Sequence, residues 1–194
     1  MIIERFDIEE FNKHQKNREW NFTDKEENRI RQIKHGEEGY IVEITNNKEI
    51  FTMGKYFYPN GILAQKGLYF WSGGFNKGIW TDYDERGNIV EQTDYDAPYK
   101  NYPWEKIKAH MESKGADLLD PFTHVSRENE NNHPMWYISW LTQGFDKSGN
   151  QMIRNEEIDG NTGKVLLIYN VYYYEPTDGI PPPEKEIIYD ANER

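Results

Sequence analysis

The fold of this chain is decided by the stretch KYFYPNGILAQKGLYFWSGGFNKGIWTDYDERGNIVEQTDY, which runs from Lys55 to Tyr95. It contains two copies of one unit, and each copy begins and ends at a tyrosine. The first begins at Tyr58 and closes at Tyr69, and the second begins at Tyr83 and closes at Tyr95. The two beginnings lie 25 residues apart, and a fixed period of this length is typical of a stacked supersecondary unit.

Each unit is predicted to be a β-hairpin. The turns are Asn60-Gly61 in the first unit and Arg86-Gly87-Asn88 in the second, and both place a glycine where a left-handed backbone is needed. Aromatic and β-branched residues flank both turns, as strands require. A fainter echo at residues 145–150 (FDKSGN) shares the turn chemistry, which Asp and Gly favour anywhere.

Upstream of this stretch, the sequence predicts one short helix and further strands of the same meander. The helix covers residues 7–15, where Asp7 can cap it and Ile8 and Phe11 fall on one face. Alternation of apolar and polar residues predicts the strands, at residues 18–23, 29–34, 40–45 and 49–53.

Downstream, two prolines between Asp96 and Pro103 interrupt any regular ladder and mark a boundary. A helix is predicted over residues 104–114, with Pro103 at its start and Gly115 at its end. Its apolar stripe consists of Trp104, Ile107 and Met111.

A small sheet is predicted after this helix. The polar residues 127–132 (RENENN) are expected to form an exposed loop. Residues 159–163 (DGNTG) predict a turn, and from Gly179 onward the chain has the composition of a polyproline tail. The sheet is expected to be antiparallel and three-stranded, with strands at residues 135–141, 151–159 and 164–175. The predicted class is α+β, with a β-meander domain over 1–102 and a helix-plus-sheet domain over 103–194.

The repeat stretch also resembles a known family. Gly67-x-Tyr69, Gly74-x-x-x-Gly78-x-Trp80, Tyr83 and Gly87-Asn88 resemble the MORN-type repeats of the YwqK family of antitoxins. The resemblance covers roughly 40 residues and two units. It implies a β-meander of MORN-like hairpins in a bacterial immunity protein, which binds and blocks a cognate protein toxin.

The C-terminal half carries a second, weaker resemblance. A helix followed by a three-stranded antiparallel sheet, with Trp140 and the stretch 158–165, is similar to small PepSY-like or cystatin-like α+β units. This likeness implies a fold and no activity.

Composition limits the kinds of partner. The net charge is -11 and the pI is about 5.0, which argues against nucleic acid and against anionic membrane surfaces. The charge is compatible with a basic protein partner such as a nuclease toxin, and equally with ordinary solubility. The absence of cysteine excludes disulfides, thiolate zinc sites and cysteine nucleophiles. Without a signal segment or an apolar run long enough to span a bilayer, the chain is expected to be cytoplasmic.

The sequence predicts no catalytic, cofactor-binding or metal-binding residues. The histidines lack the spacing of a metal motif, and His110, which lies on the predicted helix, is expected to be a boundary residue rather than a catalytic base. The stretch 82–87 begins like a calcium loop, but Arg86 and Thr93 stand where acidic ligands belong. Adjacent carboxylates such as Glu156-Glu157 are expected to lie in solvent.

What remains is a candidate surface for a protein partner. Four aromatic residues lie around a glycine hinge, and an acidic set follows them. The predicted partner-binding residues are Tyr69, Phe70, Trp71, Phe75, Asp82, Asp84, Glu85, Glu91, Asp94 and Asp96. Because alternate residues of a strand face opposite sides, the aromatic residues belong either to an interface or to a two-sided core.

The leading hypothesis is therefore a non-enzymatic immunity protein. One alternative is a carbohydrate-binding module or small glycan-acting enzyme, in which aromatic residues such as Trp71 stack on sugars. A second alternative is a structural repeat scaffold that associates with itself.

Overall fold

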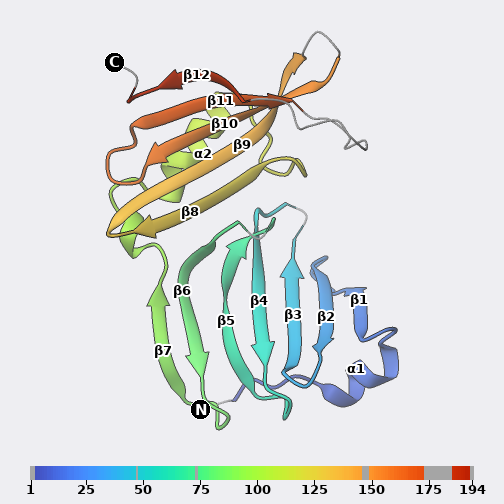
Figure 1. Cartoon of the computed structure of the whole chain (residues 1–194). Coiled ribbons are helices and arrows are strands. Elements are labelled where there is room, and N and C mark those ends of the chain that lie inside the picture. The colour runs from blue at the N-terminus through green and yellow to red at the C-terminus, as the bar shows by residue number, and fades with distance from the viewer. Residues whose placement is uncertain (1–2, 47, 73, 146–148, 173–184, 193–194) are drawn as a thin grey trace. The chain divides into compact units, whose positions relative to one another are not determined.

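The computed structural model describes residues 3–46, 48–72, 74–145, 149–172 and 185–192 (Figure 1). The chain forms two compact units, Met1–Asp96 and Ala97–Arg194. The division lies a few residues before the boundary expected after residue 102. The reason is the short 3-10 turn η1 (Ala97–Tyr99), whose Tyr99 packs on Trp136 of the second unit with ring centroids 4.9 Å apart.

The N-terminal unit is a single seven-stranded antiparallel sheet whose strands follow one another in chain order. Each strand pairs with the next, so the whole sheet is a meander (Figure 1). Its strands are β1 (Glu19–Thr23), β2 (Arg29–His35), β3 (Gly39–Thr45), β4 (Phe51–Phe57), β5 (Leu63–Phe70), β6 (Asn76–Tyr83) and β7 (Ile89–Asp94).

Both predicted hairpins are confirmed. Gly61, with φ 78°, lies in the turn between β4 and β5, and Gly87, with φ 82°, lies in the turn between β6 and β7. These values fall in the left-handed region that only glycine adopts without strain. The opening tyrosines of the two units also meet, because the Tyr58 hydroxyl donates to the Tyr83 carbonyl oxygen at 2.7 Å.

One face of this sheet is covered by the N-terminal segment and helix α1 (Ile8–His14). Asp7 caps the helix as predicted, with its carboxylate accepting from the Glu10 amide at 2.9 Å. Phe6 stacks on Tyr40 at 4.4 Å, and Phe11 is almost fully buried. Burying each such side chain stabilises the unit by about 2 kcal/mol, so these rings anchor the segment to the sheet.

The C-terminal unit is a five-stranded antiparallel sheet packed on helix α2 (Trp104–Ser113), which lies behind the strands in Figure 1. The predicted stripe is confirmed, because Trp104, Ile107 and Met111 are all buried. The strand order is β12-β11-β10-β9-β8. The strands are β8 (His124–Glu130), β9 (His133–Phe145), β10 (Gln151–Asp159), β11 (Val165–Tyr172) and β12 (Glu186–Asp190).

The expectation of three strands is wrong, because two edge strands flank the predicted ones. β8 occupies most of the predicted loop 127–132, since its Val125 is buried and the Arg127 guanidinium lies over the rings of Tyr99 and Trp136. Arg127 therefore occupies an inward-facing position where an apolar residue is expected. For this reason the segment lacks the alternation of apolar and polar residues that predicts a strand. β12 occupies part of the predicted tail, and residues 179–184 lie outside the described residues.

The described residues form mostly antiparallel sheet with two α-helices, as the α+β class requires. Neither of the described helices is long and apolar enough to cross a membrane.

Candidate functional site

The second face of the seven-stranded sheet, opposite the Phe6–Phe11 core, carries three of the ten predicted partner-binding residues, Tyr69, Asp82 and Glu91. The register of β1 to β7 places one set of alternate residues there. We call it the carboxylate–tyrosine face, and its main residues are Glu19, Arg29, Arg31, Glu43, Tyr56, Tyr69, Trp80, Asp82 and Glu91.

A chain of hydrogen bonds runs across this face. The Arg31 guanidinium donates to both carboxylate oxygens of Glu19, at 3.0 and 3.1 Å, and to Glu43 at 3.1 Å. The second oxygen of Glu43 accepts from the Tyr69 hydroxyl at 2.9 Å. The chain thus joins β1, β2, β3 and β5, and fixes four side chains on the sheet surface.

Gly54 explains how Tyr69 reaches across an intervening strand. Register places Gly54 on β4 between Glu43 on β3 and Gly67 on β5. A Cβ atom at Gly54 would lie 3.0 Å from Cε1 of the Tyr69 ring. The missing side chain therefore leaves room for the ring beside β4.

The neighbouring glycine supports a second ring. A Cβ atom at Gly67 would lie 2.3 Å from the Trp80 ring, so the indole lies flat against the bare backbone. The indole Nε1 donates to the Leu68 carbonyl oxygen at 2.9 Å, and Trp80 is only 4% exposed. Gly67 and Trp80, which the sequence singled out as a motif, thus form a fixed part of this face.

The electrostatics follow from these contacts. Hydrogen bonds from Arg31 and then Asn21 lower the pKa of the Glu19 carboxyl from 4.5 to about 2. Burial, followed by the charge of Glu43, raises the pKa of the Tyr69 hydroxyl above its ordinary value. Tyr69 therefore stays a neutral donor, and Glu19 stays ionised at any physiological pH.

The structure separates the four predicted aromatic residues. Tyr69 lies on the carboxylate–tyrosine face, and Trp71 is partly buried. Phe70 and Phe75 are corrected to interior residues, because they are 0% and 6% exposed and their rings stack at 5.6 Å. The reason is the period of two, which points Phe70 to the opposite side from Tyr69.

The six predicted acidic residues do not form one patch either. Asp82 and Glu91 are cross-strand partners on the carboxylate–tyrosine face, and Asp82 accepts from Gln65 at 2.7 Å. Glu85 is exposed in the turn beyond it.

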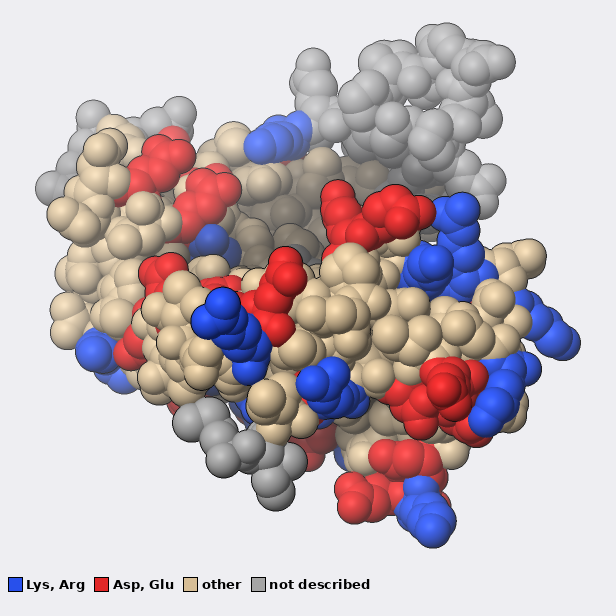
Figure 2. Space-filling view, turned by 90° about the horizontal axis from the view of Figure 1, so that it is seen from below, with Lys and Arg blue, Asp and Glu red and all other residues tan. Residues whose placement is uncertain are grey.

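The other three acidic residues serve local structure. Asp84 binds the Arg86 and Asn88 amides of its own turn at 2.9 and 2.8 Å. Asp94 accepts from the Asp96 amide at 3.0 Å, and the Asp96 carboxylate pairs with the Lys77 ammonium at 2.8 Å. Figure 2, a view from below, shows acidic and basic side chains interspersed on the surface.

The second unit contains a buried polar pair that the sequence did not reveal. His110 on α2 and Glu156 on β10 lie 2.6 Å apart, between Nε2 and Oε2. The Glu156 side chain is 3% exposed, which corrects the expectation that it lies in solvent, whereas the His110 side chain on α2 keeps 20% exposure. The alternation of β10 points Glu156 toward the helix, and that direction depends on the register with β9.

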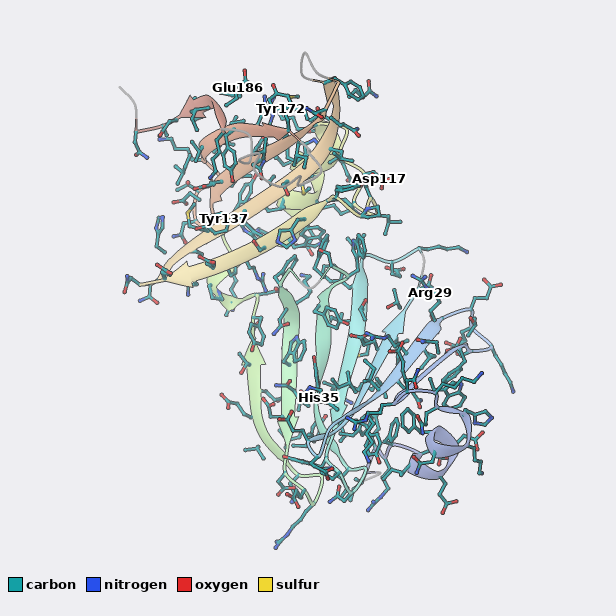
Figure 3. The ribbon with its side chains drawn as sticks, turned by 45° about the vertical axis from the view of Figure 1, so that its right-hand side comes forward. Arg29, His35, Asp117, Tyr137, Tyr172 and Glu186 are labelled. Atoms are coloured by element: carbon teal, nitrogen blue, oxygen red, sulfur yellow. The ribbon has the colours of Figure 1, made fainter. Side chains whose placement is uncertain are left out.

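Further polar groups lie on the same helix-facing side. Glu186 accepts from the Asn170 amide at 3.1 Å and from the Tyr172 hydroxyl at 2.8 Å, and Figure 3 shows Glu186 beside Tyr172. Within the described part of the chain, Arg154 Nε and Asn170 Oδ1 are buried without a hydrogen-bond partner. Buried atoms of this kind are usually paired with water or protein, so this layer is incompletely satisfied.

Among the residues that the structure describes, no group of three or more His, Asp or Glu side chains could hold a metal ion. The resemblances to YwqK-type and to PepSY-like or cystatin-like proteins stay predictions from the residues. Comparisons of the chain with protein-family models, with curated proteins and with solved structures found no match.

Proposed function

We propose that the protein is a non-enzymatic immunity protein that binds a cognate protein toxin through the carboxylate–tyrosine face. The observation that supports this best is the hydrogen-bonded chain from Glu19 through Arg31 and Glu43 to Tyr69. Side chains that are fixed before association lose little conformational entropy on binding, which favours affinity.

The charge of the face favours a basic partner. Four carboxylates, of Glu19, Glu43, Asp82 and Glu91, stand on it against the guanidinium groups of two arginines on β2. The whole chain carries a net charge of -11, which accelerates association with a basic surface. The protein would block its toxin by covering the basic surface sterically, without chemical change.

The test is protection of cells from the protein encoded beside this one. We expect co-expression to restore growth, and the two purified proteins to form a complex that calorimetry detects. The variant D82K/E91K should bind at least about tenfold more weakly, because it reverses the charges of a half-buried and an exposed carboxylate on β6 and β7 of this face.

The matched control is E9K/E37K, which changes the net charge equally at exposed positions away from the face. Thermal melting should show both variants folded. Failure of the wild type to protect would reject the immunity function, whereas full protection by D82K/E91K would reject only this docking face.

A further inference from the structure

The five-stranded sheet has an open face opposite α2, and its polar residues lie in register. Trp136 and Ile138 of β9 point to the buried side, so Tyr137 and Ser139 point to the open side. The pairing of β8, β9, β10 and β11 then places four side chains in one row across the sheet, namely His124, Ser139, Asn155 and Tyr169. Figure 3 marks Tyr137 on this sheet.

A hollow of about 190 Å³ lies over this row. The side chains that line it are two tyrosines, an amide, a hydroxyl, an imidazole and a carboxylate, which belong to Tyr137, Tyr169, Asn155, Ser139, His124 and Glu157. Such a mixture of flat apolar surface and a few polar groups is typical of small-molecule sites. The volume is below that of drug-sized sites, so the hollow suits one ring rather than an extended ligand.

The polar groups in the hollow keep their hydrogen-bonding capacity. Among the described residues, the side chains of His124, Ser139 and Glu157 have no hydrogen-bond or ion-pair partner. The Asn155 amide makes one long bond, from Nδ2 to the Ile153 carbonyl oxygen at 3.3 Å, and its oxygen accepts none. These groups differ from those of the carboxylate–tyrosine face, which bind one another.

The two tyrosines flank the hollow. Tyr137 on β9 and Tyr169 on β11 are separated by one strand, and therefore by about 10 Å across the sheet. The Lys185 ammonium lies 4.3 Å from the centroid of the Tyr169 ring, so one face of this ring carries a cation. Burial, followed by the charges of Glu128 and Glu157, raises the pKa of Tyr137, so its hydroxyl remains a donor.

We propose that this hollow binds a neutral pyranose ring of a saccharide. The apolar C–H face of the sugar would pack on a tyrosine ring, and its hydroxyls would bind Asn155, Ser139 and Glu157, which offer both donors and acceptors. A neutral ligand suits this lining, because Glu157 is the one acidic side chain that faces the hollow, beside two tyrosines, a serine and an asparagine. The site is independent of the toxin-binding face.

The experiment uses the full chain and four probes, the methyl glycosides of glucose, galactose, mannose and N-acetylglucosamine. Saturation-transfer NMR should detect at least one of them, with a dissociation constant on the order of 1 mM. The variants N155A and Y169A should each weaken binding at least about tenfold, since each removes one recognition element.

The control variant is Y189A, which removes a tyrosine that is 43% exposed and pairs in register with Ile168 on the helix-facing side. It should bind like the wild type, and melting curves should show every variant folded. The proposal is overturned if none of the four glycosides binds, or if N155A and Y169A bind as tightly as Y189A. An oligoarginine peptide that binds in place of every sugar, and is lost in E157Q, would also overturn it.

Discussion

The polar side chains on the carboxylate–tyrosine face of the first sheet and on the open face of the second sheet differ in how they are hydrogen-bonded. On the carboxylate–tyrosine face, Glu19, Arg31, Glu43 and Tyr69 satisfy one another in a chain of hydrogen bonds. On the open face of the five-stranded sheet, the polar groups around Asn155 lack such partners. The hydrogen-bonded side chains of the carboxylate–tyrosine face form a fixed surface that suits a protein partner. The side chains on the open face keep free donors and acceptors that can bind a small ligand.

Glycine accounts for much of this difference. Gly54 and Gly67 lie within β4 and β5, and they let the rings of Tyr69 and Trp80 lie flat and reach a neighbouring strand. The strands β10 and β11 contain no glycine, so every residue there carries a side chain that stands on the sheet. Tyr137 and Tyr169 therefore have no glycine on these strands to lie against, and a hollow remains between their rings.

The largest effect is expected at the buried pair of the second sheet. The variant H110L leaves the Glu156 carboxylate buried without its partner, and it should lower the free energy of unfolding by about 4 kcal/mol. The double variant H110L/E156L should recover most of this loss, because it removes both polar groups. Chemical denaturation measures both values.

The control for this cycle is H35L in the first sheet. His35 and Glu38 are 2.8 Å apart but 60% and 78% exposed, so the free energy of unfolding should change by less than about 0.5 kcal/mol. Equal losses in H110L and H35L would show that burial does not distinguish the two pairs.

An intermediate effect is expected at the glycines of the first sheet. G67A forces a Cβ atom into the Trp80 ring, which the sheet confines, and should cost about 2 kcal/mol of stability. G54A brings a Cβ atom to 3.0 Å from Cε1 of the Tyr69 ring and should cost about 1 kcal/mol, because this contact is less severe than the 2.3 Å contact at Gly67. Thermal melting of the two variants gives the order, and the reverse order would contradict the role assigned to Gly67.

The smallest effect concerns titration on the carboxylate–tyrosine face. Because the folded pKa of Glu19 is depressed to about 2, its contribution to stability is present above pH 4.5 and is lost as the pH falls toward 2. In R31Q the NMR titration midpoint of Glu19 should rise toward 4.5. Asp24 serves as the control, since its lowered pKa depends on Asn28. An unchanged Glu19 midpoint in R31Q would exclude Arg31 as the cause.

Local features were predictable from the sequence. The structure confirms the turn glycines Gly61 and Gly87, the Asp7 cap and the apolar stripe of α2, each of which depends on residues close in the chain. The candidate site was predictable only in part. Tyr69, Asp82 and Glu91 do share one face, whereas Phe70 and Phe75 lie in the interior.

The features that were missed depend on contacts between distant strands. β8 has a charged, loop-like sequence, and it is a strand because Arg127 stacks on Tyr99 and Trp136. The sequence predicts that Glu156 is exposed beside Glu157. In the structure it is buried, because the Glu156 side chain points from β10 toward His110 on α2. The hollow between Tyr137 and Tyr169 had no local signal, since four strands contribute to it.

By itself, the sequence determined where the strands of the meander turn, where α2 begins and ends, and the acidic character of the chain. These properties arise from backbone preferences and charges of neighbouring residues, which need no partner. Only the tertiary structure decided which side of each sheet a residue occupies. A shift of one residue in strand register exchanges the two faces, and register is fixed by packing between strands that are far apart in the chain.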